Sequence, residues 1–360
     1  WGSGAHREQV IDTDATVVTR LDAAGAVLVA KLTLGELAQG DIWFGGTTKN
    51  PWNLAQGASG SSAGPGSAVA AGLVTFAIGS ETLGSISSPS TRNGVTGLRP
   101  TFGAVPRTGA MALSWTMDKL GPMARSVDDC RLVFSVIRGA DGQDPTVSLP
   151  VDGRWVSDPR PLAGMRIAIV RTAFDATPAR PSKAADDAAI AALERAGARL
   201  EPVTLPDAPY LALRTILTAE AAAAFDELTR SGRDAQLVQQ GPQAWPATFR
   251  TARFLPAVDY INANRIRTTV MRQWASFIAP YDAVVVPTNF ITQLLATNLT
   301  GHPAVILPHG FVPTSASDAT PVPVSITVLG QLHGEASALR VAQAIEQGVG
   351  VHRRRPPMAT

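Results

Sequence analysis

Serine hydroxyls on two glycine-rich loops are the groups in this sequence best suited to chemistry. Residues 57–66 form the first loop and carry Ser61 and Ser62, and residues 79–89 form the second and carry Ser85. Glycine reaches backbone conformations that are closed to other residues, so both loops can turn tightly and present these hydroxyls. A serine hydroxyl is a poor nucleophile until its proton has an acceptor. Two serine loops that meet could therefore supply a nucleophile and a proton relay.

The second loop is also suited to holding negative charge. Consecutive backbone N–H groups from Gly79 to Ser85 can converge as an anion-binding nest, which is what an oxyanion hole requires. A compact helix is expected from Ala68, and the amide groups and dipole at a helix N-terminus favour a nearby negative charge. One short helix and one strand join the two loops, so both loops can lie at the same end of a sheet.

Two other interpretations of the first loop stay open. Glycine- and serine-rich loops commonly cap and connect elements without any chemistry. In addition, residues 60–64 (GSSAG) satisfy G-x-S-x-G, the nucleophile elbow of α/β-hydrolases, which would make Ser62 the nucleophile with a downstream Asp and His. An elbow must follow a strand directly, and residues 49–59 (KNPWNLAQGAS) lack a strand pattern, which disfavours it.

The rest of the sequence alternates between short apolar runs and alanine-rich helical patterns. Such runs predict strands buried on both faces, and the alanine-rich periodic segments predict helices. The alternation predicts an α/β fold, a single large layered domain with a central mixed, mostly parallel sheet covered by helices. The predicted strands are Ala26–Val29, Leu73–Ile78, Met165–Val170, Ala283–Val286, Ala304–Leu307 and Val324–Leu329, and the predicted helices are Ser182–Ala196, Pro209–Ser231, Val258–Phe277 and Glu335–Gln347.

Composition argues against several other classes of protein. With 45% hydrophobic and 17% charged residues among 360, the chain can bury a large core. Its 31 basic and 29 acidic residues are interspersed, so we expect no surface for nucleic acid or membrane. No apolar run reaches the roughly 18 residues that span a bilayer, and the five histidines lack metal-ligand spacing. The single Cys130 cannot form an internal disulfide, which fits a cytoplasmic location.

Three short motifs lie in the serine loops and directly after them. Residues 59–64 read SGSSAG, residues 79–89 read GSETLGSISSP, and residues 97–103 read GLRPTFG. They resemble the amidase-signature family, whose pattern is a GGSSGG loop, an alanine-rich helix, a strand, then G-T-D-x-G-G-S-I-R-x-P and G-L-(K/R)-P-T-x-G. Other segments, such as residues 301–304 (GHPA), follow in family order, so the resemblance covers nearly the whole chain.

The resemblance also implies how the chain is organised. It implies one amidase-signature domain over residues 1–360 that lacks its N-terminal segment, with a site-bearing core at residues 45–130. The sequence starts at Trp1 without a methionine, which fits that expectation.

The resemblance implies a specific catalytic site. In that family a serine nucleophile is activated through a second serine, held by a cis peptide bond, and a neutral lysine. Carried over residue by residue, the nucleophile is Ser85 and the relaying serine is Ser61, 24 positions earlier. Ser62 and Gly60 would support the loop, and no metal or organic cofactor is implied. The oxyanion would be held by the backbone N–H groups of Thr82, Leu83, Gly84 and Ser85.

The family's catalytic lysine falls outside this sequence. It lies several tens of residues before the first loop, at a point upstream of Trp1. Lys31 matches a different family lysine, so we interpret it as structural. Lys49 and Lys119 are expected in loops, and Lys183 at the start of a peripheral helix. If the lysine were truly absent, the protein would bind substrate without turning it over.

Departures from the family pattern limit the choice of substrate. The family's arginine two residues after the nucleophile is Ser87 here, which disfavours recognition of a substrate carboxylate. Leu83 replaces a common glycine and must adopt a negative φ or carry strain. Met111, Trp115 and Met117 are expected to line an apolar substrate pocket, with ordinary core packing as the alternative.

Three functions follow from these expectations. The first is hydrolysis of a carboxamide or related C–N bond (amide, aryl amide or carbamate), or of an ester, through an acyl-Ser85 intermediate. Its partner would be an uncharged small molecule, and the protein would be a monomer or homodimer. The second is that of an A-type glutamine amidotransferase component, which would need partner chains and a carboxylate-binding arginine. The third is a catalytically inactive binding protein.

Overall fold

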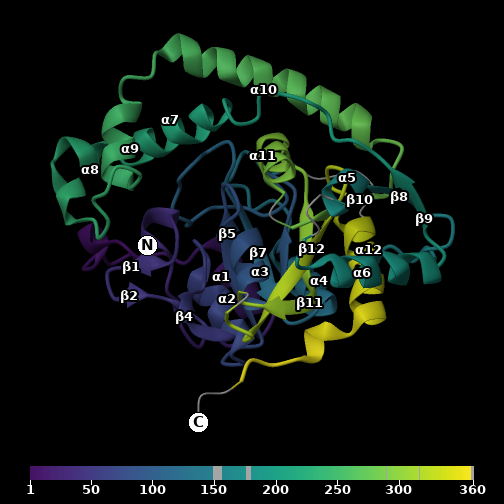
Figure 1. Cartoon of the computed structure of the whole chain (residues 1–360). Helices are drawn as coiled ribbons and strands as arrows, with labels where there is room; N and C mark the ends of the chain where they lie inside the picture. Colours follow the sequence, from purple (N-terminus) through teal and green to yellow (C-terminus); the bar gives the residue numbers. More distant parts are fainter. Residues whose placement is uncertain (149–155, 176–179, 289, 316, 358–360) are drawn as a thin grey trace.

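A central sheet of eight strands runs through the molecule (Figure 1). The computed structural model describes residues 1–148, 156–175, 180–288, 290–315 and 317–357. Helices cover the sheet, which confirms the predicted α/β class. In spatial order the strands are β5 (Phe76–Glu81), β7 (Lys119–Ala124), β6 (Thr96–Arg99), β11 (Ala304–Pro313), β12 (Pro321–Leu329), β10 (Ala283–Pro287), β8 (Arg166–Ile169) and β9 (Arg199–Pro202).

The sheet is mixed but mostly antiparallel, so the expectation of a mostly parallel sheet is wrong. Only the pairs β10–β8 and β8–β9 are parallel, and the other five pairs are antiparallel. A parallel pair needs a long crossover, which α6 (Lys183–Arg195) supplies between β8 and β9. A short connection joins β11 to β12 and allows only an antiparallel pair. A continuous apolar run shows that a strand is buried, but not its direction.

The two faces of the sheet pack into separate apolar clusters. Ile167 and Ile169 of β8 face one cluster and Ala168 faces the other, because successive strand residues point to opposite faces. Helices α1 (Thr16–Ala23), α4 (Val127–Ile137), α6 and α12 (Glu335–Val349) contribute to the first cluster. Helices α7 (Arg214–Ala224), α10 (Ala257–Ile278) and α11 (Ile291–Thr300) contribute to the second.

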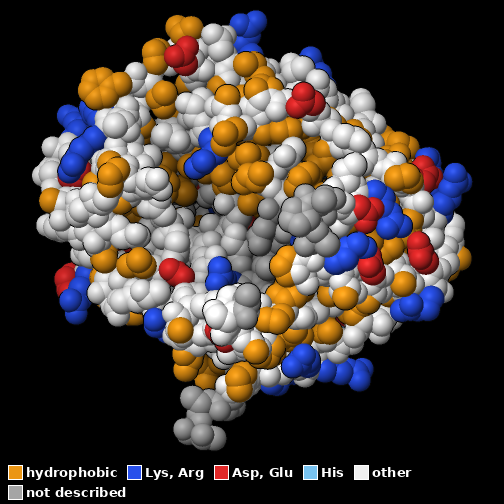
Figure 2. Space-filling view, viewed as in Figure 1, with side chains coloured by type: hydrophobic (Ala, Val, Ile, Leu, Met, Phe, Trp, Pro, Cys, Tyr) orange, Lys and Arg blue, Asp and Glu red, His pale blue; other side chains and the backbone are white. Residues whose placement is uncertain are grey.

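Helices α7, α8 (Asp226–Arg230), α9 (Trp245–Ala252) and α10 form an arch at the top of the view, which we call the helical arm (Figure 1). The ring of Phe249 stacks on the rings of Trp245 and Phe225, with centroids 4.9 and 5.5 Å apart. The predicted helix over 209–231 is two helices, because Phe225 (φ −115°, ψ 26°) interrupts it. Figure 2 shows the surface hollowed beneath the arm, with hydrophobic side chains around the hollow.

Most other predicted elements are confirmed. The segments expected around residues 165–170, 182–196, 258–277, 283–286, 304–307, 324–329 and 335–347 correspond to β8, α6, α10, β10, β11, β12 and α12. The strand expected at Leu73–Ile78 starts three residues later, at Phe76.

Two expectations about strands are wrong. Residues 26–29 form no strand, and the side chains of Val27, Leu28 and Val29 are 83%, 75% and 67% exposed. No strand in the described part of the chain pairs with this run, and an apolar run alone does not supply a partner. Residues 49–59, expected to lack a strand, contain a small hairpin of two strands that pair with each other and not with the main sheet.

The remaining elements are short. They are α2 (Ala63–Ala70), α3 (Ser87–Asn93), α5 (Arg171–Phe174), the strands β1 (Ile42–Trp43) and β2 (Gly46–Thr47), and the hairpin strands β3 (Lys49–Asn50) and β4 (Asn53–Gly57). Within the described ranges, no helix combines the length and apolar character needed to cross a membrane.

Candidate active site

The two serine loops are in direct contact. The backbone N–H of Ser62 donates a hydrogen bond of 3.1 Å to the carbonyl oxygen of Ser85. Helix α2 begins immediately after Ser62, and β5 ends four residues before Ser85, so a strand and a helix fix the two loops at one end of the sheet. The peptide bond between Gly60 and Ser61 is cis. Both Ser61 and Ser85 are buried, at 1% and 8% exposure.

Ser62 fastens the first loop to β5. Its hydroxyl donates to the carbonyl of Ser80 (3.1 Å) and accepts from the Ser80 N–H (3.0 Å). The hydroxyl is fully buried, and its proton is already committed to a backbone carbonyl. This environment fits a supporting residue and disfavours the nucleophile-elbow interpretation.

Ser61 has the opposite environment. Its hydroxyl is buried, yet it has no hydrogen-bond partner among the described residues. A buried polar group without a partner costs about 1–3 kcal/mol. The hydroxyls of Ser90, Thr96 and Ser325 share this state, but of the four residues only Ser61 lines the cavity beside the serine loops. Ser61 lines a cavity of about 690 Å³ together with Thr82 and Lys31. Ser61 therefore lies at the edge of the cavity that the second serine loop also lines.

The loop from Thr82 to Ser85 turns directly into α3. Gly84 has a φ of +94°, and a Cβ atom there would lie 3.2 Å from a methyl group of Leu294. Leu83 does not have a positive φ, and its side chain packs against the second apolar cluster. The replacement of glycine by leucine at this position is thus accommodated without a left-handed backbone.

Glu81 holds the backbone that directly follows Ser85. One carboxylate oxygen accepts from the N–H of Ile86 (2.9 Å), the N–H of Ser87 (2.8 Å) and the Ser87 hydroxyl (2.9 Å). Burial opposes ionisation of this carboxyl, but the charges of Arg99 and Lys119, together with hydrogen bonds from Arg99 and the Ser87 N–H, lower its pKa to about 2. Glu81 is therefore an anionic anchor for the residues that follow Ser85.

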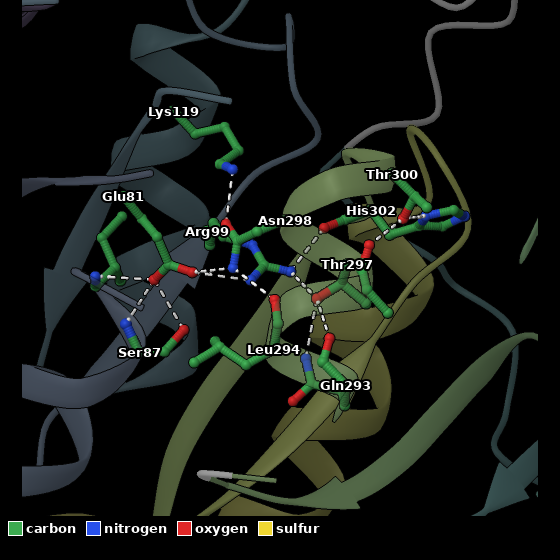
Figure 3. A network of polar contacts seen from close by, with 12 residues as sticks. Glu81, Ser87, Arg99, Lys119, Gln293, Leu294, Thr297, Asn298, Thr300 and His302 are labelled. Atoms are coloured by element: carbon green, nitrogen blue, oxygen red, sulfur yellow. Dashed lines mark hydrogen bonds and ion pairs between the residues drawn. The ribbon is translucent and has the colours of Figure 1, made fainter. Parts of the chain in front are cut away.

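The other oxygen of Glu81 joins three elements (Figure 3). It accepts from Arg99 of β6 at 2.9 Å and from the side-chain amide of Asn298 of α11 at 2.8 Å. Arg99 also donates to the Thr297 hydroxyl (2.8 Å) and the His302 carbonyl (2.9 Å). Arg99 and Glu81 are both fully buried. The second serine loop thus rests on an ion pair that spans β5, β6 and α11.

Lys119 was expected in a loop, and that expectation is wrong. It begins β7, directly opposite Glu81, and its ammonium group donates to the Asn298 amide oxygen at 2.7 Å (Figure 3). Burial, followed by the neighbouring charge of Arg99, lowers the pKa of Lys119 well below its ordinary value. Sequence reasoning missed both Lys119 and Asn298. Residues 118–124 (DKLGPMA) do not alternate between polar and apolar residues, so the local pattern gave no indication of a strand here.

Asp118 holds the second loop from the other side. Its carboxylate accepts from the Thr82 hydroxyl at 2.5 Å and from the N–H groups of Leu113 and Ser114. Burial raises the pKa of Asp118, and these hydrogen bonds oppose that rise. Neighbouring residues 118 and 119 therefore support opposite sides of the loop, as strand alternation requires.

The three predicted substrate-binding residues separate into two environments. Met111 and Trp115 line the cavity that contains Ser61 and Thr82. Met117 is 2% exposed and packs in the second apolar cluster, so it is an ordinary core residue, which was the alternative to a place in the substrate pocket.

The buried histidines do not approach the serine loops. His302 shares a hydrogen bond of 2.7 Å with Thr300, and His309 contacts Asp186 at 2.7 Å and the Val324 carbonyl at 3.1 Å. In the part of the chain that the structure describes, no group of three or more His, Cys, Asp or Glu residues could hold a metal ion.

Comparison with known proteins agrees with this arrangement. The Amidase family model matches residues 1–306, which include both serine loops and the network around Glu81. The chain belongs to the amidase family.

Two kinds of amidase-family protein are among its relatives. The A-type component of the glutamyl-tRNA(Gln) amidotransferase of Moorella thermoacetica is 33% identical over 389 residues, covering 96% of this chain and 78% of that protein. The native peptide amidase of Stenotrophomonas maltophilia has a TM-score of 0.79 at 30% identity, covering 96% of this chain and 78% of that one. An amidase family protein of Bacillus anthracis has a TM-score of 0.84 at 24% identity over 99% of this chain and 75% of that one, a likeness of fold.

Proposed function

We propose that this amidase-family protein hydrolyses a carboxamide or related C–N bond of an uncharged small molecule through an acyl intermediate on Ser85. Amides, aryl amides and carbamates are the proposed substrates, with ester hydrolysis as a side activity. The observation that carries the proposal is the buried, unpartnered hydroxyl of Ser61. It lies one residue before Ser62, whose N–H is bound to the carbonyl of Ser85.

The proposed reaction has two halves. The Ser85 oxygen attacks the substrate carbonyl carbon while its proton passes to Ser61, which gives its own proton to a base. Backbone N–H groups of residues 82–85 stabilise the oxyanion, and one such donor is typically worth about 100-fold to 1000-fold in rate. The tetrahedral intermediate then expels the amine, which takes up the proton returned through Ser61. Water attacks the acyl-Ser85 ester in the second half, and the carboxylic acid leaves.

The proposed base is a lysine, expected N-terminal to Trp1. This assignment makes residues 1–360 part of one amidase-signature domain whose site-bearing core is at residues 45–130. Lys31, which lines the cavity beside Ser61, keeps its interpretation as structural. We further propose a cytoplasmic monomer or homodimer that needs neither cofactor nor nucleic acid.

The two positions at which an arginine could bind a substrate carboxylate support an uncharged substrate. Ser87 stands where the family has an arginine, and its hydroxyl is used by Glu81. Arg107 lines the cavity, but its guanidinium is paired with Asp144 at 3.2 Å and donates to the Trp115 carbonyl at 2.8 Å. A guanidinium that is already paired has little left to offer a substrate carboxylate.

A second candidate is glutamine hydrolysis within an amidotransferase. The relatives named as amidotransferase components favour it. This candidate requires recognition of the α-carboxylate of glutamine, for which the paired state of Arg107 and the serine at position 87 are poorly suited.

A substrate panel tests the proposal. Purified protein is assayed with p-nitroanilides, aryl carbamates and glutamine, and Ser85→Ala serves as the control for each. We expect kcat/KM for the best uncharged amide to exceed that for glutamine by at least about tenfold, since a missing charge partner costs more than about 1.4 kcal/mol. A preference for glutamine would support the amidotransferase instead. Equal turnover by the Ser85→Ala variant would remove Ser85 from the mechanism.

A further inference from the structure

Residues 111–117 form a loop that separates two cavities, and we call it the wall loop. One cavity, of about 690 Å³, lies beside the serine loops. The other, of about 740 Å³, extends toward the helical arm and is lined there by Phe225 and Leu228. The wall loop and Trp1, which also lines both cavities, therefore lie between them and bound the first cavity on this side. The wall-loop residues that line both cavities are Met111, Ala112 and Trp115.

Asp118 ties the wall loop to the second serine loop. One of its oxygens accepts from the N–H groups of Leu113 (2.8 Å) and Ser114 (2.9 Å). The other accepts from the Thr82 hydroxyl at 2.5 Å. Asp118 therefore holds Thr82 and the N-terminal half of the wall loop with hydrogen bonds that do not involve Glu220.

Glu220 ties the wall loop to the helical arm. This residue lies on α7 and is 4% exposed. One carboxylate oxygen accepts from the Ser114 hydroxyl (2.5 Å) and the Thr116 N–H (3.2 Å). The other accepts from the Thr116 hydroxyl (2.9 Å) and from the hydroxyl of Tyr260 on α10 (2.8 Å). A buried carboxylate with four donors is fully satisfied, and such networks hold one arrangement strongly.

Arg267 adds a second connection from α10. It donates to the Thr116 hydroxyl (2.6 Å) and the Thr116 carbonyl (2.8 Å), and also to the Leu299 carbonyl in α11 (2.5 Å). Glu220 and Arg267 thus hold Thr116 from two helices of the arm. This anchoring is stronger than a loop would need merely to connect β7 to the preceding segment.

We propose that Glu220 is a positioning residue that fixes the wall loop and thereby limits the length of the apolar group that the substrate can carry. The proposal rests on the proposed function, because it takes the substrate to occupy the cavity beside Ser61. With the wall loop fixed, that cavity ends at Met111 and Trp115. When the wall loop is released, the two cavities join and longer apolar groups fit.

The test is a chain-length profile of Glu220→Gln. An amide nitrogen in place of one carboxylate oxygen cannot accept a hydrogen bond, and the negative charge that interacts with Arg267 is lost, so the junction is weakened. With acyl p-nitroanilides from acetyl to decanoyl, we expect kcat for the acetyl substrate to change less than about threefold. We expect KM for the decanoyl substrate to fall by about tenfold or more, as roughly two buried methylenes would produce. Glu194→Gln, an exposed change on α6, is the matched control. An unchanged length profile in Glu220→Gln would overturn the proposal.

Two single-bond variants keep the proposal testable if Glu220→Gln folds poorly. Ser114→Ala removes one donor from the loop side, and Tyr260→Phe removes one from the arm side. Both should shift the profile toward longer chains. The shift of the profile in the double variant should be smaller than the sum of the two single shifts, because both hydrogen bonds act through Glu220. Additive effects, or no shift in either, would contradict a role for this junction.

Hydrogen exchange tests the same junction without turnover. Tyr260→Phe should increase exchange at the amides of residues 113–116 by about tenfold while leaving those of residues 82–85 less affected. Unchanged exchange at residues 113–116 would overturn the proposal even in an active enzyme. Inactivity of the wild-type protein on every amide would instead contradict the proposed function, and the exchange result would still decide whether the junction holds the loop.

Discussion

Ser61 and Ser62 are neighbours in the chain, but their hydroxyls lie in different environments. The Ser62 hydroxyl both donates to and accepts from the backbone of Ser80. The Ser61 hydroxyl is equally buried and has no partner among the described residues. Hydrogen bonds of the first kind stabilise a fold, whereas a buried hydroxyl of the second kind lowers stability. The pair therefore separates a structural role, at Ser62, from the chemical role that we propose for Ser61.

Alanine substitutions at the two serines should affect different quantities, stability for Ser62 and the rate of turnover for Ser61. Ser62→Ala should lower the free energy of unfolding by about 1–2 kcal/mol, because Ser80 loses two hydrogen bonds. Ser61→Ala should leave stability unchanged or slightly higher, yet lower kcat by about 100-fold or more through loss of proton transfer. Urea denaturation and steady-state kinetics of both variants measure this. A large loss of stability in Ser61→Ala would show that its hydroxyl has a structural partner.

The serines of the candidate site could be found from sequence, but the residues that support them could not. The glycine-rich loops indicate that serine hydroxyls are presented there, and the resemblance to the amidase-signature family implies Ser61 and Ser85 in particular. Lys119 and Asn298 lie far apart in sequence, and only the pairing of β5 with β7 and the packing of α11 bring them to Glu81. A single lysine beside an aspartate gave no indication that its side chain would be buried.

Among the helices, α12 carries a carboxyl that links stability to pH. Glu346 is 5% exposed, and one of its oxygens accepts from the N–H of Val127 at the start of α4. Burial, together with the charges of Asp128 and Asp129, raises the pKa of Glu346 to about 7 from an ordinary 4.5. The folded protein thus keeps this proton to higher pH than the unfolded chain does. Its contribution to stability is complete below pH 4.5 and is lost as the pH rises through about 7.

Glu346→Gln should remove that dependence. At a pH of about 8.5 the variant should be more stable than wild type, on the order of 2 kcal/mol, since glutamine keeps an acceptor without a buried charge. At a pH of about 5 the difference should be small. Urea denaturation at the two pH values, with Glu194→Gln as control, measures the effect. The same pH profile in Glu346→Gln and wild type would assign the dependence to another group.

The elements themselves were predicted unevenly, for physical reasons. Helices such as α6, α10 and α12 were placed within a few residues, because their apolar period reflects the face that they bury. Residues 26–29 have the composition of a strand but remain exposed, since pairing depends on a neighbour that local sequence does not specify. The predicted direction of the strands was wrong for a similar reason. The hydrophobicity of a run indicates that a strand is buried, whereas the connections between strands determine whether they pair in parallel.

At the scale of the whole molecule, the sheet and the helical arm have different tasks. The sheet positions Ser61 and Ser85 at one end through β5 and its neighbours. The arm lies above that end and reaches the wall loop through Glu220 and Arg267. Under the two proposals, the sheet would position the reacting groups and the arm would limit the substrate, so changes in one part need not alter the other.

The most direct measurement of the central claim is covalent labelling by a fluorophosphonate, followed by peptide mapping. The account predicts one adduct, on Ser85. Labelling should be absent in Ser85→Ala and slower by about 100-fold in Ser61→Ala, because the nucleophile loses its proton relay. Labelling should persist in Ser62→Ala wherever that variant is folded. An adduct on Ser62, or a labelling rate in Ser61→Ala equal to that of wild type, would contradict the account.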